Sequence, residues 1–215
     1  MTTRVVVRAF TALCVAVFAM RAAADSVPPL PSLLGFEAGR SFLAEVQARL
    51  GQASEIQEPK NPEGFPGLCY RSSAADDRTF VIFRAGPSFS FPGDISEFTI
   101  RAGPPEDVRA NSCTRTRPVR GSLHLSNGLS LGMREKDALK LLGAPAQRST
   151  GKLVYSTQYR RDITPDDMAK LVEVMGADLA TGNRVLLGNA VVEIALRKGR
   201  VASITVTRVE EPSKR

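Results

Sequence analysis

Few side chains in this sequence combine the types and spacings that chemistry requires. His124 is the only histidine that could act as a base, but no nucleophile or carboxylate lies near it in the sequence. The paired carboxylates at residues 76–77 and 166–167 are explained by a turn and by the start of a helix. One histidine and three cysteines give poor support for a multi-ligand zinc or iron–sulfur site. We therefore predict no catalytic residue, no metal site and no cofactor, and a protein that is not an enzyme.

The first 24 residues have the three parts of a secretory signal peptide. Arg4 and Arg8 form a basic head, residues 9–20 are almost wholly apolar, and alanines at 22–24 precede an expected cleavage site before Asp25. The apolar run is shorter than a bilayer span, and an uncleaved membrane anchor is the alternative interpretation. A lipoprotein is disfavoured because its first mature residue would have to be cysteine. We expect a periplasmic or secreted protein with no transmembrane helix in the mature chain.

Cleavage at this site would leave a mature chain of 191 residues with two cysteines, Cys69 and Cys113. An even number of cysteines in an oxidising compartment predicts a disulfide bond between them, and two buried free thiols are the alternative. The bond would close a loop of about 45 residues and contribute roughly 4 kcal/mol in the chain-entropy model. The cysteines lack the close Cys-x-x-Cys spacing of a redox pair, which favours a structural role.

The mature chain repeats one order of elements, a helix followed by three strands. Residues 95–100 match residues 201–206 in type, and Tyr70 has a counterpart in Tyr155. Chance similarity between amphipathic segments is the alternative to an internal duplication. The predicted elements are a helix at 41–50 with strands at 68–72, 79–85 and 95–101, then a helix at 133–142, with Ala138, Leu141 and Leu142 inward, and strands at 153–160, 191–197 and 201–208.

The second repeat holds an extra helix between its first and second strands. Thr164 can cap this helix, Pro165 suits its first turn, and the acidic residues 166–167 complement the helix dipole. We expect the helix to end near Gly176. The predicted organisation is a signal peptide at 1–24, a Pro-rich leader at 25–32, a first repeat at 33–103, a basic linker at 104–122, a second repeat at 123–210 and a tail at 211–215.

A motif in the second repeat resembles the pattern of the BamE (SmpA) outer-membrane assembly lipoproteins. It consists of Ser130-Leu-Gly-Met133, a helix that ends in Leu142-Gly143-Ala144-Pro145, and a short strand around Tyr155. The β-lactamase inhibitor protein carries the same unit in tandem. The resemblance implies an α+β fold of two tandem units, each a helix packed on an antiparallel sheet of at least three strands, with the other sheet face open to a protein partner. The first repeat departs from the pattern because it lacks the Gly-Met and the Pro, and no lipidation cysteine is present.

Strand alternation indicates which side chains of the second repeat lie on that open face. They are hydroxyl, amide and charged residues that alternate with apolar ones. We interpret them as a polar surface that recognises a protein, although the solvated side of an ordinary sheet would have the same pattern. The candidate partner-binding residues are Ser156, Gln158, Arg160, Glu193, Arg197, Thr205 and Thr207.

The linker is basic, and Arg109 is the first of its four central arginines. Arg115, Arg117 and Arg120 are candidates for binding a polyanion such as an anionic lipid headgroup or lipopolysaccharide, and a flexible, solvated linker is the alternative. The expected function is a non-enzymatic protein-binding module of the cell envelope, such as an assembly factor, an adaptor or an inhibitor. A structural or polyanion-binding envelope protein is the alternative, and an unrecognised hydrolase has less support. Nucleic acid is not an expected partner, and the sequence predicts no oligomeric state.

Overall fold

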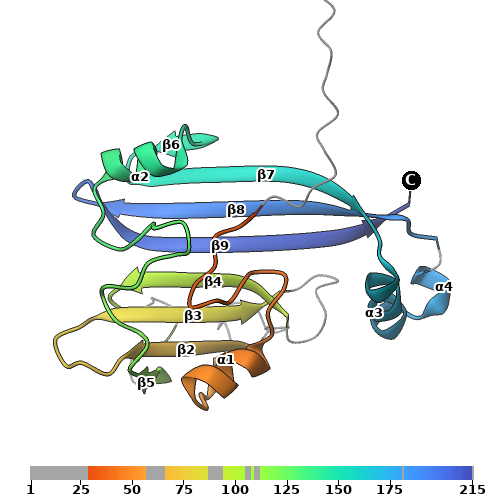
Figure 1. Cartoon of the computed structure of the whole chain (residues 1–215), viewed down its shortest axis with the longest axis horizontal. Helices are drawn as coiled ribbons and strands as arrows, with labels where there is room; N and C mark the ends of the chain where they lie inside the picture. Colours follow the sequence, from red (N-terminus) through yellow and green to blue (C-terminus); the bar gives the residue numbers. More distant parts are fainter. Residues whose placement is uncertain are drawn as a thin grey trace, which may run out of the picture.

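A computed structural model describes residues 29–56, 66–86, 94–104, 108, 112–180 and 182–214. The predicted signal peptide, the first part of the Pro-rich leader and Arg109 lie outside these residues. The described chain has an α+β fold built on one large, mainly antiparallel sheet (Figure 1). None of the described helices is both long enough and apolar enough to cross a membrane.

The sheet has the strand order β1-β2-β3-β4-β9-β8-β7-β6, and β5 pairs with β2 in parallel outside this path. The strands are β1 (Glu55–Ile56), β2 (Gly67–Ser72), β3 (Thr79–Ala85), β4 (Ile95–Ala102), β5 (Thr114–Thr116), β6 (Gln147–Ser149), β7 (Lys152–Asp162), β8 (Val185–Arg197) and β9 (Arg200–Ser213). The helices are α1 (Leu43–Leu50), α2 (Glu135–Leu142), α3 (Pro165–Met175) and α4 (Ala177–Ala180).

Each helix and strand expected from the sequence is present, but several elements are longer or additional. The short elements β1, β5, β6 and α4 were not expected, and β8 begins at Val185 instead of residue 191. Glycine and asparagine are typical of turns, so Gly188 and Asn189 gave no sign in the sequence that the strand begins before residue 191. Gly188 lies beneath the ring of Tyr159, where an added Cβ would be 2.1 Å from a ring carbon. The glycine therefore makes room for an aromatic side chain within a continuous strand.

The start of α3 confirms the capping signal in the sequence. The backbone N–H of Asp167 donates to the hydroxyl of Thr164 at 3.2 Å, and the N–H of Thr164 donates to the Asp167 carboxylate at 2.9 Å. Pro165 occupies the first turn, where a missing N–H costs nothing. Gly176 follows the last helical residue, as predicted. These local contacts fix where the chain leaves β7 and enters α3.

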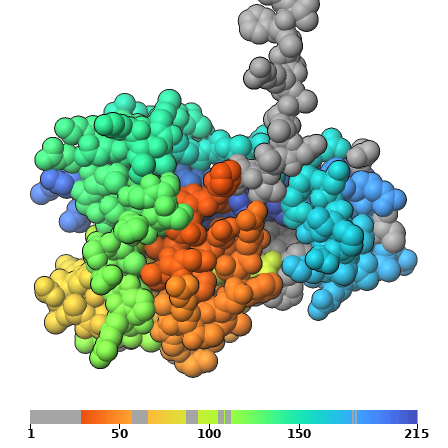
Figure 2. Space-filling view, in the orientation of Figure 1, coloured from red at the N-terminus to blue at the C-terminus, as the bar shows by residue number. Residues whose placement is uncertain are grey.

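The main core lies on the side of the sheet that α1 and α2 cover (Figure 1). The ring of Phe83 is in the middle of this core, with its centroid 5.5 Å from that of Phe36 and 6.4 Å from that of Tyr70. Edge-to-face packing of such buried rings stabilises a core by more than the burial of their apolar surface alone. Figure 2 shows the same side, where the N-terminal part of the described chain (orange) lies between the segment around residues 120–145 (green) and α3 (cyan).

One core expectation is wrong, because Leu141 is 43% exposed. Ala138 is buried and Leu142 packs against the core, as expected, and Leu139 packs there as well. α2 lies over the β6–β7 end of the sheet in Figure 1, so only a narrow stripe of the helix meets the core. Leu141 is outside that stripe.

The disulfide between Cys69 and Cys113 is present, as predicted. Both cysteines are buried and pack with Phe80 and Ile82 in a small cluster separate from the main core. The described part of the predicted linker is built into the fold: β5 pairs with β2 next to the disulfide, and Val119 is fully buried. This part of the chain is therefore a structural element, and the alternative of a flexible, solvated linker does not hold for it.

Candidate functional site

The side of the sheet opposite the main core, which we call the open face, carries the candidate site. One row of directly paired residues crosses β2, β3, β4, β9 and β8 on this face. Two of its members belong to the small disulfide cluster, while α1 and α2 place their buried residues in the main core on the other side. The row consists of Cys69, Ile82, Thr99, Thr205 and Glu193.

A hollow of about 330 Å³, which we call the groove, lies over the four central strands of the open face. Its floor is rich in hydroxyl groups. The hydroxyl oxygens of Thr99 and Thr205 are 3.0 Å apart, and the hydroxyl of Thr207 donates to Glu97 at 3.4 Å. The lining residues are Ile82, Arg84, Glu97, Thr99, Arg101, Val191, Glu193, Ser203, Thr205 and Thr207.

Two ion pairs border the groove and neutralise its carboxylates. Arg84 Nη1 lies 3.1 Å from Glu97 Oε1, and Lys152 Nζ lies 2.7 Å from Glu193 Oε2. The side chains of Lys152 and Glu193 are close to half exposed, so water screens this pair and it stabilises the fold by less than about 1 kcal/mol. The two acidic side chains of the groove are thus paired with Arg84 and Lys152. Arg101 also lines the groove and forms no ion pair with a described carboxylate, so an acidic group of a partner could bind it.

A row of arginines, Arg115, Arg71 and Arg101, crosses the open face at one end of the groove. Arg115 is paired with Arg71 across β5 and β2, and Phe80 on β3 lies between Arg71 and Arg101. The Nε atoms of Arg71 and Arg101 are buried, and neither has a hydrogen-bond partner in the described structure. A buried donor without an acceptor costs about 1–3 kcal/mol. Arg71 and Arg101 are nevertheless partly exposed and Arg115 is exposed, so the arginine row gives this end of the open face accessible positive charge that suits carboxylate groups of a partner.

A second hollow of about 500 Å³ lies further along the same face, over β7, β8 and β9. Gln158, Asn189 and Val209 are directly paired across these strands, and all three line this hollow. Leu187 also lines it and is 48% exposed. The two hollows together give the open face a polar centre and one apolar contact point.

The structure brings most of the predicted partner-binding residues to the open face. Three of them share the groove, and one lines the second hollow. Glu193, Thr205 and Thr207 line the groove, Gln158 lines the second hollow, Ser156 and Arg160 lie exposed on β7, and Arg197 lies at the hairpin between β8 and β9, paired with Arg200.

The predicted polyanion-binding arginines are all exposed, but only one lies in the arginine row. Arg115 is on β5, whereas Arg117 and Arg120 follow it in the loop that leads back toward the core side. Alternation in the second repeat alone did not indicate the contribution of β3 and β4 to the groove. The signal was available in β4, where Glu97, Thr99 and Arg101 alternate with apolar residues.

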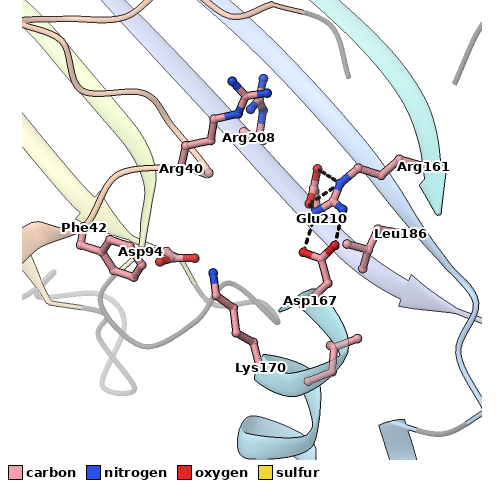
Figure 3. Close-up of a pocket in the computed structure, with 11 residues that line it drawn as sticks. Arg40, Phe42, Asp94, Arg161, Asp167, Lys170, Leu186, Arg208 and Glu210 are labelled. Carbon is pink, nitrogen blue, oxygen red and sulfur yellow. Dashed lines mark hydrogen bonds and ion pairs between the residues drawn. The ribbon is translucent and has the colours of Figure 1, made fainter. Parts of the chain in front are cut away.

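A small cavity of about 80 Å³ lies on the core side, between α3 and the ends of β7, β8 and β9 (Figure 3). Arg161 bridges two carboxylates at its wall: it donates to Asp167 on α3 at 2.5 and 3.0 Å, and to Glu210 on β9 at 2.6 Å. The hydroxyl of Tyr159 also donates to Glu210, at 2.6 Å. We call these four residues the α3 anchor.

The electrostatics of the α3 anchor indicate a structural role. Burial opposes ionisation of Asp167, but hydrogen bonds from Arg161 and Thr164 outweigh it and lower the pKa of Asp167 to about 2. Hydrogen bonds from Arg161 to Asp167 raise the arginine's pKa despite burial, and burial together with the bond to Glu210 raises the pKa of Tyr159. Asp167, Arg161 and Tyr159 are therefore held in their usual charge states, which is the reverse of what a general acid or base requires. The anchor fixes α3 to the sheet.

The remaining candidates for chemistry stay isolated. His124 is exposed, with ring Nδ1 3.1 Å from the carbonyl oxygen of Leu125. Across the part of the chain that the structure describes, no three His, Cys, Asp or Glu side chains are grouped so that they could hold a metal ion.

Comparison of the chain with protein-family models, with curated proteins and with solved structures finds no match. The resemblance to BamE and to the β-lactamase inhibitor protein therefore stays a prediction.

Proposed function

We propose that the chain is a non-enzymatic protein-binding module of the cell envelope, and that it binds an acidic segment of a partner on its open face. The observation that carries this proposal is the arginine row, in which Arg71, Arg101 and Arg115 lie on one face, are at least partly exposed and form no ion pair with a described carboxylate. Charge-assisted hydrogen bonds from arginine to carboxylate are about twice as strong as neutral ones. The hydroxyl-rich groove beside Arg101 can then bind the partner's backbone and polar side chains.

We also infer that the sheet is built from two tandem copies of one helix-and-sheet unit. The strand order supports this, because it reads β1-β2-β3-β4 from one edge and β6-β7-β8-β9 from the other, and the two halves meet at β4 and β9. A shared contact supports it further. The hydroxyl of Tyr70 donates to the carbonyl of Gly51 at 2.8 Å, and the hydroxyl of Tyr155 donates to the carbonyl of Gly143 at 3.2 Å. In each case the tyrosine ties its strand to the glycine that ends the preceding helix.

The junction between the two proposed copies lies under the groove. The sequence match of residues 95–100 with 201–206 makes Thr99 and Thr205 equivalent, and these two residues pair directly across β4 and β9. A local two-fold axis would pass through this pair. The groove has lining residues from both halves of the sheet, so a single copy would not form it. This supports a binding role that depends on the tandem arrangement.

An envelope location is consistent with three features. The first is the signal-peptide pattern of the first 24 residues, the second is the disulfide bond, and the third is that both mature cysteines are used in that bond. We propose a periplasmic or secreted protein whose partner is also exposed to this compartment.

The test is affinity capture from cell envelopes with residues 25–215 and two charge-reversal variants. Arg101→Glu changes the arginine row, and Lys136→Glu makes the same charge change at an exposed site on α2, on the opposite side of the sheet. We expect one envelope protein that binds the unchanged chain and the Lys136 variant with equal affinity. Its affinity for the Arg101 variant should be lower by a factor of about ten or more. Equal loss in both variants, or binding only to vesicles that contain phosphatidylglycerol, would contradict the proposal.

A further inference from the structure

The outer edge of β7 has a long stretch that no other described strand covers. β6 pairs with β7 only at Lys152, Leu153 and Val154. From Tyr155 to Arg160 the edge has no strand partner among the described residues. Figure 1 shows β6 and α2 over one end of β7 only.

This edge lacks the features that usually prevent a strand from pairing with another chain. Natural proteins block edges with proline, a bulge, inward-pointing charges or a covering segment. Residues 155–159 contain no proline and no charged side chain, the charged residues of β7 lie at Lys152 and from Arg160 onward, and the register between β7 and β8 is continuous. An edge of this length and composition is therefore competent to accept a further strand.

The structure contains a model for such an added strand at the corresponding edge of β2. There, Tyr70, Arg71 and Ser72 pair in parallel with residues 114–116 of β5. Tyr155 corresponds to Tyr70, since both donate to the carbonyl of the glycine that ends the preceding helix. The residues of β7 that correspond to the β5-covered part of β2 are thus 155–157.

The contacts of β5 indicate which side chains a strand added to β7 would need. The hydroxyl of Thr116 donates to the carbonyl of Leu50 at 3.1 Å, and that of Thr114 donates to the carbonyl of Gln52 at 3.5 Å. These carbonyls belong to the end of α1, where a helix leaves acceptors without partners. The corresponding carbonyls at the end of α2 belong to Leu142 and Ala144.

We propose that the outer edge of β7 binds an extended segment of a partner protein that runs parallel to β7 and has threonine or serine at alternate positions. The outward-pointing backbone groups within residues 155–157 would supply affinity through hydrogen bonds, and the two hydroxyls would bind the carbonyls of Leu142 and Ala144. A second copy of the chain does not fit this model, because a two-fold axis would pair the β7 strands antiparallel. The proposal rests on the proposed function and its two-copy interpretation, and it assigns the partner a second contact away from the groove.

The test is an NMR titration of the isotope-labelled mature chain with a synthetic peptide derived from β5. The peptide Ser-Ser-Thr-Gln-Thr-Gln-Pro keeps the alternate threonines and removes the positive charges. A control peptide replaces both threonines with valine, which has a similar strand propensity and no hydroxyl. We expect amide shifts at Tyr155, Ser156 and Thr157 with the threonine peptide, and about fivefold weaker binding for each hydroxyl removed.

The direction of the added strand is tested with a nitroxide label on the peptide's N-terminus. A parallel strand places the label near Tyr155, so the amide signal of Tyr155 broadens more than that of Arg160. Equal affinity of the valine peptide, stronger broadening at Arg160, or no shift along β7 at millimolar peptide would overturn the proposal. Concentration-dependent dimerisation with shifts at the same residues would overturn it in favour of a second copy.

The two proposals fail in different ways. Arg101→Glu is expected to leave the peptide titration unchanged, because Arg101 is on β4 and β7 is three strands away in the sheet. Loss of the envelope partner with Arg101→Glu, together with no peptide binding at β7, would remove the edge proposal and leave the proposed function intact.

Discussion

Replacement of Asp167 with asparagine is expected to weaken the attachment of α3 to the sheet. Asp167 and Arg161 have side chains that are 13% and 21% exposed, so water screens their ion pair only in part. The pKa of Asp167 falls from 3.8 to about 2 in the folded chain. Because one pKa unit corresponds to about 1.36 kcal/mol, the ionised carboxylate stabilises the folded chain by about 2 kcal/mol at neutral pH.

The pH dependence of this effect has a definite sign. Folding lowers the pKa of Asp167, so the stabilisation is fully present above the unfolded value near 3.8 and is lost as the pH falls through about 2. In urea unfolding at pH 7, we expect Asp167→Asn to lower the free energy of unfolding by about 2 kcal/mol. The difference between the two proteins should shrink as the pH is lowered from 4 to below 2, because the unchanged protein loses the same contribution.

Asp166→Asn is the matched control, since Asp166 is in the same helical turn but exposed. It removes a favourable charge near the helix N-terminus, which is worth less than about 1 kcal/mol. Equal effects of the two substitutions at pH 7, or a difference that persists below pH 2, would refute the ion-pair account of the α3 anchor.

Three further predictions concern stability, measured by the free energy of unfolding in urea. Replacing Cys69 and Cys113 together with alanine should lower it by about 4 kcal/mol, because the lost bond closes a long loop in the unfolded chain; no change on reduction of the unchanged protein would refute this. Tyr70→Phe should lower it by about 1 kcal/mol and Tyr155→Phe by less. The hydroxyl of Tyr70 is more buried, and its hydrogen bond is shorter, at 2.8 against 3.2 Å. A larger effect of Tyr155→Phe would contradict this ranking of the two hydrogen bonds. Gly188→Ala should cost about 2 kcal/mol, because the new methyl group displaces the tyrosine ring above it; a neutral effect would show that the ring moves freely.

Local sequence signals predicted the elements of the fold well, and long-range pairing limited the rest. The capping residues at 164–167 and the glycines at 51 and 143 act within one turn of chain, so the helix ends could be read directly. The short strands β5 and β6 have no apolar pattern of their own. They exist because a neighbouring strand and, for β5, a disulfide hold them in place.

The candidate site was predicted in part for the same reason. Alternation within single strands identified Thr205 and Thr207, because each strand has its own polar side. The pairing of β4 with β9 is a contact between segments far apart in sequence, and it brings Thr99 and Arg101 next to these threonines. The bond from Arg161 to Glu210 spans 49 residues of sequence and likewise had no local signal.

Site-specific photo-cross-linking tests the central claim, that a protein partner binds the open face, most directly. A benzophenone side chain is introduced at Thr205 in the groove, or at Lys136 on the opposite side of the sheet, and the chain is irradiated in intact envelopes. We expect one envelope protein to be cross-linked from position 205 and not from position 136, with the cross-link in an acidic segment of that protein. The same proteins captured from both positions, or no protein cross-link from position 205, would contradict it.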